Sequence, residues 1–463
     1  MALPSQLLHA VSELAGGRVV LIIGAGCSAE PPTDLPLSDR CALEAHEKLI
    51  DDGVLANGEC PNPSDLSCLA DTVIAKTGKQ YDLVERLPRE RFRQARPNHG
   101  HLLAAAMMRE RTLSCVMTLN FDLAMTSALT EVGGEEVSVI AKPEEFIHLG
   151  NVNLVYLHCN VEADPEAWII SSEALERGWQ NGWQEIVAQK VMVSPVIVFV
   201  GLGTPVAVLL ESTYRVKRAL PESTSVFQVD SGAPENSRFF QKLGVDRENY
   251  IQMTWVNFMR ALADRLTKEH IRSISAACDR LIRTEGWQMD ANAVKQFCQT
   301  LSNLELLGLG KLRARSILSD GDYCPHSNFT VDWLADLLLG IYYVENTGNC
   351  KAHIHEDGVV EFTRDGQPVG TAVVVSGRGV RRWLTLETDV NQYQHHWSHY
   401  IGKPQCVLAS GITDSRPISI AAPKQLVSDE ESSIVSDVEK TEMYTVDEIR
   451  RKPNVIGRFI SHG

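Results

Sequence analysis

The chain has 463 residues, a formal net charge of -15 at pH 7 and 44% hydrophobic residues. This length suggests two or three domains, and the apolar fraction is ordinary for a globular protein with sizeable cores. The acidic balance argues against strong direct binding of nucleic acid.

Targeting and membrane signals are not expected. The N-terminus lacks a basic region followed by an apolar core, which argues against a secretory signal. The longest uncharged stretch, about residues 191–210, is interrupted by two prolines and two glycines, so no membrane helix is expected. The 11 cysteines include no C-x-x-C pair. This is typical of reduced cysteines in a cytoplasmic protein rather than of a zinc ribbon.

Short apolar strands alternate with helices through the first 230 residues. Helices are predicted at about 4–16, 40–52, 64–86, 93–108, 123 onward, 172–190 and 205–219. Strands are predicted at 19–23, 114–117, 137–140, 154–157, 196–200 and 225–229. Three prolines predict a loop over 31–39. The alternation predicts an α/β fold with a Rossmann-like parallel sheet.

A second domain follows. Helices are predicted over 255–285 and 290–318, then a helix at 331–342 with strands at 359–362, 369–375 and 382–388. We therefore divide the chain into a sheet domain, 1–268, and a separate C-terminal α+β domain, 269–463. The acidic, serine-rich segment 428–440 is expected to be mobile.

A glycine turn follows the first strand, in the sequence RVVLIIGAGCSAE. Gly24, Gly26 and Ala29 have G-x-G-x-x-A spacing, which suits a tight turn, close approach of a phosphate and close helix packing. A helix after the turn would direct its N–H groups at an anion, and Ser28 would add a hydroxyl. The alternative is a purely structural turn.

Further polar residues follow the ends of later strands, where open α/β sheets bind ligands. They are Asn120 and Asp122 in TLNFD, His158, Gly203 with Thr204, and Asp230. Each also has a structural explanation. Asn120 or Asp122 would cap the next helix, a buried His158 would be satisfied by its surroundings, and Asp230 would begin a turn. Cys27 and Cys159 are expected to be small buried side chains rather than nucleophiles.

The ordered set GAGCS, TLNFD, Leu157-His158, Gly203-Thr204 and Asp230 resembles the sirtuins over about residues 10–265. The chain is more similar to the sirtuin-like domains of bacterial anti-phage NAD hydrolases than to protein deacylases. Deacylases carry a four-cysteine zinc module, whereas residues 160–200 contain no cysteine here. Leu119 replaces the family's glutamine, Cys159 replaces the glycine after histidine, and the family's G-I-P-D-F-R loop survives only as Asp34-Leu35-Pro36.

The resemblance implies NAD+ as substrate and no zinc. Nicotinamide leaves with its electrons, so positive charge builds on the ribose. By resemblance, Asn120 positions water at the ribose and His158 accepts a proton. The remaining roles implied are phosphate binding by Gly24, Ala25, Gly26 and Ser28, carboxamide binding by Asp122, and adenosine binding by Gly203, Thr204 and Asp230.

The histidine triplet His395, His396 and His399 in the C-terminal domain favours a packed amphipathic segment over a metal site. We expect no metal site elsewhere. The C-terminal domain is expected to assemble a homo-oligomer or to sense a trigger.

The sequence thus predicts a cytoplasmic NAD+ hydrolase that depletes NAD+ in anti-phage defence. The resemblance implies a neighbouring-gene partner such as a hexameric ATPase/translocase or an Argonaute-type protein. The alternatives are an NAD-dependent protein deacylase and a non-catalytic nucleotide-binding sensor or assembly subunit.

Overall fold

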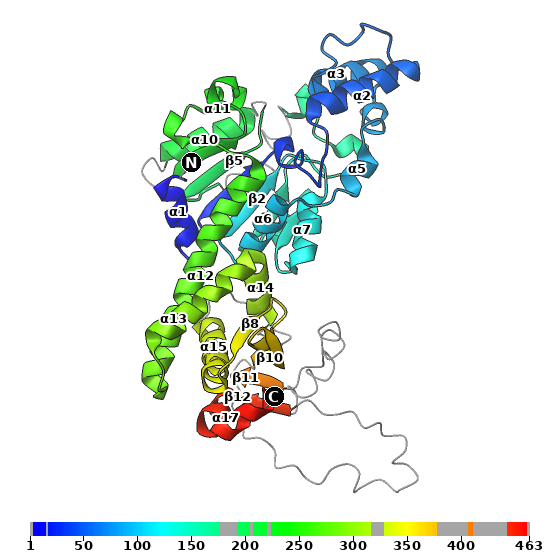
Figure 1. The fold of residues 1–463 in the computed structure, drawn as a ribbon. Coiled ribbons are helices and arrows are strands. Elements are labelled where there is room, and N and C mark those ends of the chain that lie inside the picture. The colour runs from blue at the N-terminus through cyan, green and yellow to red at the C-terminus, as the bar shows by residue number, and fades with distance from the viewer. Residues whose placement is uncertain are drawn as a thin grey trace, which may run out of the picture. The chain divides into compact units, whose positions relative to one another are not determined.

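A computed structural model describes residues 3–14, 17–175, 192–203, 207–219, 224–315, 328–376, 406–410 and 442–460. The chain divides into two compact units, Met1–Leu266 and Thr267–Gly463, whose elements are labelled in Figure 1. The predicted strand at 382–388, the histidine triplet at 395–399 and the acidic segment 428–440 lie outside the described residues, as does most of the predicted helix at 172–190.

The first unit is built on a seven-stranded sheet in the order β3-β4-β2-β1-β5-β6-β7. Every pairing in it is parallel, which confirms the predicted Rossmann-like α/β fold. The last strand, β7, was not predicted. The strands are β1 (Val19–Ile23), β2 (Leu113–Thr118), β3 (Ser138–Ile140), β4 (Asn153–Tyr156), β5 (Val196–Val200), β6 (Ser225–Asp230) and β7 (Tyr250–Gln252).

Helices cover both faces of this sheet, as strands buried on both sides require. All five residues of β1 are buried. Apolar side chains of β1, β2 and β5 form one core with α10 (Ala207–Ala219) and α11 (Arg238–Leu243). In Figure 1, α6 (His99–Arg109) and the long α12 (Trp255–Glu285) pass across the opposite face. The remaining helices of the sheet layers are α1 (Ser5–Ser12) and α7 (Ala124–Val132).

A helical insertion lies between β1 and α6, at the upper right of Figure 1. It contains α2 (Ser38–Asp51), α3 (Leu66–Thr77), α4 (Tyr81–Val84) and α5 (Arg89–Arg93), with a core of its own that includes Trp168 and Ile170. The prediction of one helix over 64–86 was wrong. Gly78 adopts φ 73° and ends α3, because a left-handed residue cannot continue a helix.

The strand order creates a switch point beside β1. The chain passes from β1 to β2 on one side of it, whereas β5 pairs with its other edge and leads on to β6. The carboxyl ends of β1 and β5 therefore lie side by side and their connections diverge. Open α/β sheets bind ligands in the crevice at such a point.

The second unit is an α+β domain, as predicted. Its sheet has the order β12-β11-β10-β9-β8, antiparallel from β8 to β10 and parallel from β10 to β12. The strands are β8 (Lys351–Ile354), β9 (Val359–Arg364), β10 (Gln367–Ser376), β11 (Cys406–Ser410) and β12 (Glu442–Thr445). Its helices are α13 (Ala291–Gln299), α14 (Glu305–Arg315), α15 (Asn328–Gly348) and α17 (Val446–Arg451).

The apolar side of α15 supplies much of the core of this unit, including Leu334, Leu338 and Ile341. The continuous helix predicted over 290–318 is interrupted, because a 3-10 turn separates α13 from α14 and Glu305 has φ 52°. Across the described residues, none of the helices has the length and apolar character needed to cross a membrane.

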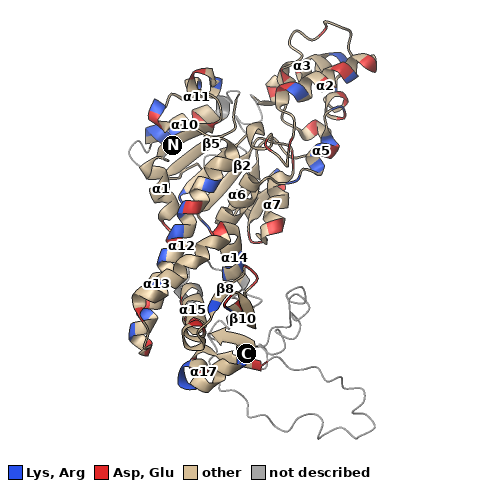
Figure 2. Ribbon diagram, in the orientation of Figure 1, with Lys and Arg blue, Asp and Glu red and all other residues tan. Residues whose placement is uncertain are grey.

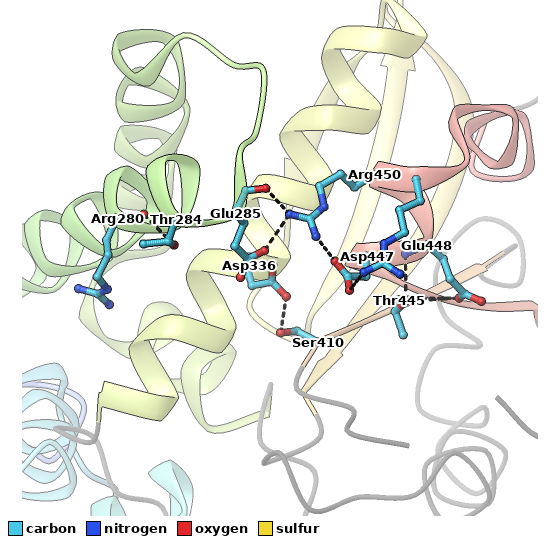
Figure 3. Close-up of polar contacts among 10 residues, drawn as sticks. Arg280, Thr284, Glu285, Asp336, Ser410, Thr445, Asp447, Glu448 and Arg450 are labelled. Carbon is cyan, nitrogen blue, oxygen red and sulfur yellow. Dashed lines mark hydrogen bonds and ion pairs between the residues drawn. The ribbon is translucent and has the colours of Figure 1, made fainter. Parts of the chain in front are cut away.

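Charged side chains are concentrated on the helices in both units (Figure 2). In the second unit, Arg450 of α17 donates to the Glu285 backbone carbonyl at 2.7 Å and also pairs with Asp447 (Figure 3). Nearby, the Ser410 hydroxyl donates to Asp336 at 2.7 Å. Burial, together with the charges of Glu285 and Asp447, raises the pKa of Asp336 to about 7, although Ser410 and Arg450 oppose the rise.

Asp336 stays protonated up to about pH 7 in the folded state, whereas its ordinary pKa is 3.8. Its contribution to the free energy of unfolding should therefore decrease as the pH rises from 3.8 to 7. Asp336→Asn keeps an acceptor for Ser410 without the titration. Relative to the parent, the variant should gain on the order of 1–3 kcal/mol of stability between pH 5 and pH 8. Urea unfolding of both proteins at the two pH values measures this gain. An equal difference at pH 5 and pH 8 would contradict the assignment.

Candidate functional site

The turn after β1 is a single 3-10 turn, Ala25–Cys27, rather than the start of a helix. The expectation of a helix N-terminus directed at an anion was therefore wrong, since the next helix, α2, begins only at Ser38. Two backbone N–H groups of the turn bond to the β5 side: Gly24 N to Val200 O at 2.9 Å and Gly26 N to Gly201 O at 3.1 Å. Those of Cys27 and Ser28 bond within the turn. A phosphate binding here would have to compete with these carbonyls.

The glycines of this turn are required by the protein's own packing. A Cβ on Gly26 would lie 2.8 Å from Gly201 Cα, and one on Gly24 would lie 2.5 Å from Leu202 Cδ2. Gly201 itself has φ 65°. The turns after β1 and β5 therefore touch at the switch point without intervening side chains. A Gly26→Val substitution would disrupt this packing, so it cannot report on phosphate binding alone.

Three predicted residues meet in one hydrogen-bonded network, hereafter the Ser28–Asn120–Asp122 network. Asn120 Nδ2 donates to Ser28 Oγ at 3.1 Å and to Gly24 O at 3.2 Å. Ser28 Oγ in turn donates to Asp122 Oδ2 at 2.9 Å. The three side chains are buried, with exposed fractions of 2%, 7% and 6%. The ends of β1 and β2 thus share a connected polar cluster in a poorly hydrated place.

The hydrogen bonds of the network show which of Asn120 and Asp122 contacts the start of the next helix. Asp122 Oδ1 accepts from Ala124 N at 3.0 Å at the start of α7, so Asp122 makes the cap-like contact. The amide of Asn120 is directed at the β1 turn instead. Burial raises the pKa of Asp122, while the Ala124 N–H and the Ser28 hydroxyl act in the opposite direction.

His158 follows β4, the strand paired with β2. Its ring lies 6.3 Å from that of Phe121, which stacks on Trp168 at 4.2 Å. Burial lowers the pKa of His158 to about 4, below its ordinary value of 6.5. The imidazole is therefore neutral at pH 7 and chemically able to accept a proton, although burial makes it a weak base.

Cys159 occupies a backbone conformation that favours glycine, with φ 67°. Its thiol donates to Ala167 O at 3.3 Å, and burial raises its pKa to about 11. Cys27 is also buried, and burial raises its pKa as well. Both thiols are protonated at neutral pH, so neither has the character of a nucleophile.

Of the predicted adenosine residues, the two that the structure describes, Gly203 and Asp230, do not join the network. Asp230 Oδ1 accepts from Gly232 N at 2.8 Å, which is the turn role considered as its alternative. Gly203 is exposed, with open space where a Cβ would stand. Thr204 lies outside the described residues. Within the described part of the chain, no group of three or more His, Cys, Asp or Glu side chains is arranged to hold a metal ion.

Sequence reasoning missed Asn98. It is fully buried at the start of α6, and its Nδ2 donates to Cys27 O at 2.8 Å and Glu30 O at 3.2 Å. The only local signal is an asparagine before the helix beginning HGHLL, which predicts a cap. Its contact with the β1 turn joins residues about 70 positions apart, which no local pattern reveals.

Comparisons with known proteins find solved structures only, since no family model and no curated protein matches. A Sir2 homologue mutant bound to ADP-ribose is similar at 16% identity and a TM-score of 0.34, over 57% of this chain and 97% of its own. A Sir2 homologue–NAD complex is similar at 15% identity and a TM-score of 0.33, over 58% and 95%. A structure titled for the mechanism and regulation of Sir2 enzymes is similar at 13% and 0.34, over 57% and 98%. Such low values assign neither a substrate nor residue roles to this chain.

The left-handed backbone conformation of Cys159 predicts that two substitutions at this position will differ in their effect on stability. Glycine tolerates this φ, so Cys159→Gly should change the free energy of unfolding by no more than about 1 kcal/mol. A β-branched residue does not, so Cys159→Val should cost roughly 2–3 kcal/mol. Denaturant unfolding measures both variants. Equal stability of the glycine and valine variants would contradict the left-handed backbone at this position.

Proposed function

We propose that the chain hydrolyses NAD+ to nicotinamide and ADP-ribose. The observation that carries the proposal is the buried Ser28–Asn120–Asp122 network at the carboxyl ends of β1 and β2, beside the switch point. A neutral histidine, His158, stands at the end of the adjoining β4. These elements supply a hydroxyl, an amide, a carboxylate and a proton acceptor at one edge of a parallel sheet, where such sheets bind ligands.

The reaction breaks the bond between the nicotinamide nitrogen and the ribose carbon, and nicotinamide keeps the electron pair. The positive charge that develops on the ribose is quenched when a water oxygen bonds to the same carbon and releases a proton. In this proposal the Asn120 amide orients the water and His158 accepts the proton. Asp122 binds the carboxamide of the leaving group, and Ser28 contributes to phosphate binding.

We further propose, from the sequence resemblance, that this activity depletes NAD+ in a cytoplasmic anti-phage response. Such an activity must be restrained in the absence of infection. A homo-oligomer assembled by the C-terminal domain would provide this control. So would a neighbouring-gene partner such as a hexameric ATPase/translocase or an Argonaute-type protein.

Asn120→Ala and His158→Ala should each lower the rate of NAD+ consumption by about two to four orders of magnitude, the range for losing a general base or an equivalent group. Affinity should fall less in His158→Ala than in Asn120→Ala, because the Asn120 amide also holds Ser28. The measurements are NAD+ turnover and calorimetry of NAD+ binding, with folding checked by circular dichroism.

Asn153→Ala is a matched control for Asn120→Ala. Its buried amide bonds to Gly150, which precedes β4 and lies away from the carboxyl ends of the strands. Parent-like turnover in both folded site variants would overturn the catalytic assignment. Tight NAD+ binding without turnover would favour the alternative function of a non-catalytic nucleotide-binding sensor. Acetyl-lysine peptide turnover that needs NAD+ and His158 would favour the deacylase.

The full chain should be a homo-oligomer assembled through the second unit, because the proposed catalytic residues all precede it. Light scattering should show a smaller species for a chain ending at Glu285, the last residue of α12. That endpoint leaves the helix intact across the boundary between the two units. The same stoichiometry in the full and shortened chains would contradict this role for the second unit.

A further inference from the structure

We propose that Asn98 is a positioning residue for the proposed NAD+ site, acting through Ser28. This inference rests on the proposed function, and it concerns a residue outside the ligand-contacting set. The side chain of Asn98 is completely buried, and its Nδ2 bonds to the two ends of a short segment that contains Ser28.

The amide of Asn98 fixes the backbone on both sides of Ser28. Nδ2 donates to the carbonyl of Cys27, the residue before Ser28, at 2.8 Å. The same nitrogen donates to the carbonyl of Glu30, two residues after it, at 3.2 Å. Because one nitrogen joins both carbonyls, it restrains the backbone on both sides of the Ser28 side chain.

Asn98 is itself held rigidly by α6. Its Oδ1 accepts from His101 N at 3.2 Å, and its own N–H donates to His101 Nδ1 at 3.3 Å. This reciprocal cap requires a neutral imidazole, and burial lowers the pKa of His101 to about 3. The His101 ring in turn packs edge-on against Trp255, with 5.9 Å between ring centroids.

Other contacts also restrain the same segment. Leu35 N donates to Ser28 O at 2.9 Å, and Asp34 N donates to Glu30 O at 3.3 Å. The Glu30 carboxylate accepts from Val256 N in the first turn of α12 at 3.4 Å. These bonds close the loop, whereas Asn98 alone among them joins it to the cap of α6.

The position of Ser28 matters because its hydroxyl is shared. It accepts from Asn120 and donates to Asp122, so a shift of its backbone would misalign both partners. Small displacements of positioned groups are costly in binding and catalysis. Asn98 thus has a consequence at the site without touching a ligand.

The test compares Asn98→Ser with Asn153→Ser. Serine remains a good N-cap and keeps an oxygen for His101, but it lacks the amide donors to Cys27 and Glu30. The control removes a pair of amide bonds elsewhere in the same unit, those between Asn153 and Gly150. Similar losses of melting temperature are expected for the two variants. NAD+ affinity should fall about tenfold or more only in Asn98→Ser.

A double-mutant cycle with Ser28→Ala separates positioning from general destabilisation. If Asn98 acts through Ser28, Asn98→Ser should weaken NAD+ binding much less in the Ser28→Ala background. If the losses of NAD+ affinity in the two single variants multiply in the double variant, the inference is overturned. Parent-like affinity in Asn98→Ser would overturn it too. If Asn120→Ala abolishes turnover while Asn98→Ser leaves affinity unchanged, only this inference fails. If the parent does not bind NAD+, both proposals fail.

Discussion

The architecture of the candidate site depends on the contact between the turns after β1 and β5. Gly26 and Gly201 approach so closely that neither position has room for a Cβ. The backbone N–H of Gly26 closes the contact by donating to Gly201 O at 3.1 Å. These turns belong to the strands that flank the switch point, so their contact restrains the backbone just before Ser28. The Ser28–Asn120–Asp122 network begins directly after this turn.

Burial strengthens the hydrogen bonds of the Ser28–Asn120–Asp122 network. Hydrogen bonds in a poorly hydrated place are electrostatically stronger than in water, and an unmade one is correspondingly costly. At Asp122, burial raises the pKa of the carboxyl group, while Ser28 and Ala124 donate hydrogen bonds to its oxygens. A substrate entering this region must replace those contacts with equally good ones. The site therefore favours a ligand rich in hydrogen-bonding groups over an apolar one.

The sequence was informative wherever a short-range pattern has a physical cause. The apolar run of β1 and the alternation of strands and helices predicted the parallel sheet, and Asn120 and Asp122 were correctly expected beyond the end of β2. The helix expected after the glycine turn failed because the same glycines also suit a tight turn packed on another strand. Asn98 could not be found locally, because its partners are distant in sequence.

The buried thiols beside the site have a consequence for observing its motion. Cys27 lies in the β1 turn and Cys159 directly follows His158, and burial raises the pKa of both. Alkylating reagents react with exposed thiolates, so labelling at either position requires the surrounding segment to open first. The labelling rate of Cys27 then reports opening at β1, and that of Cys159 reports opening at β4. The two natural cysteines thus allow local opening of the site to be measured without introducing a cysteine by mutation.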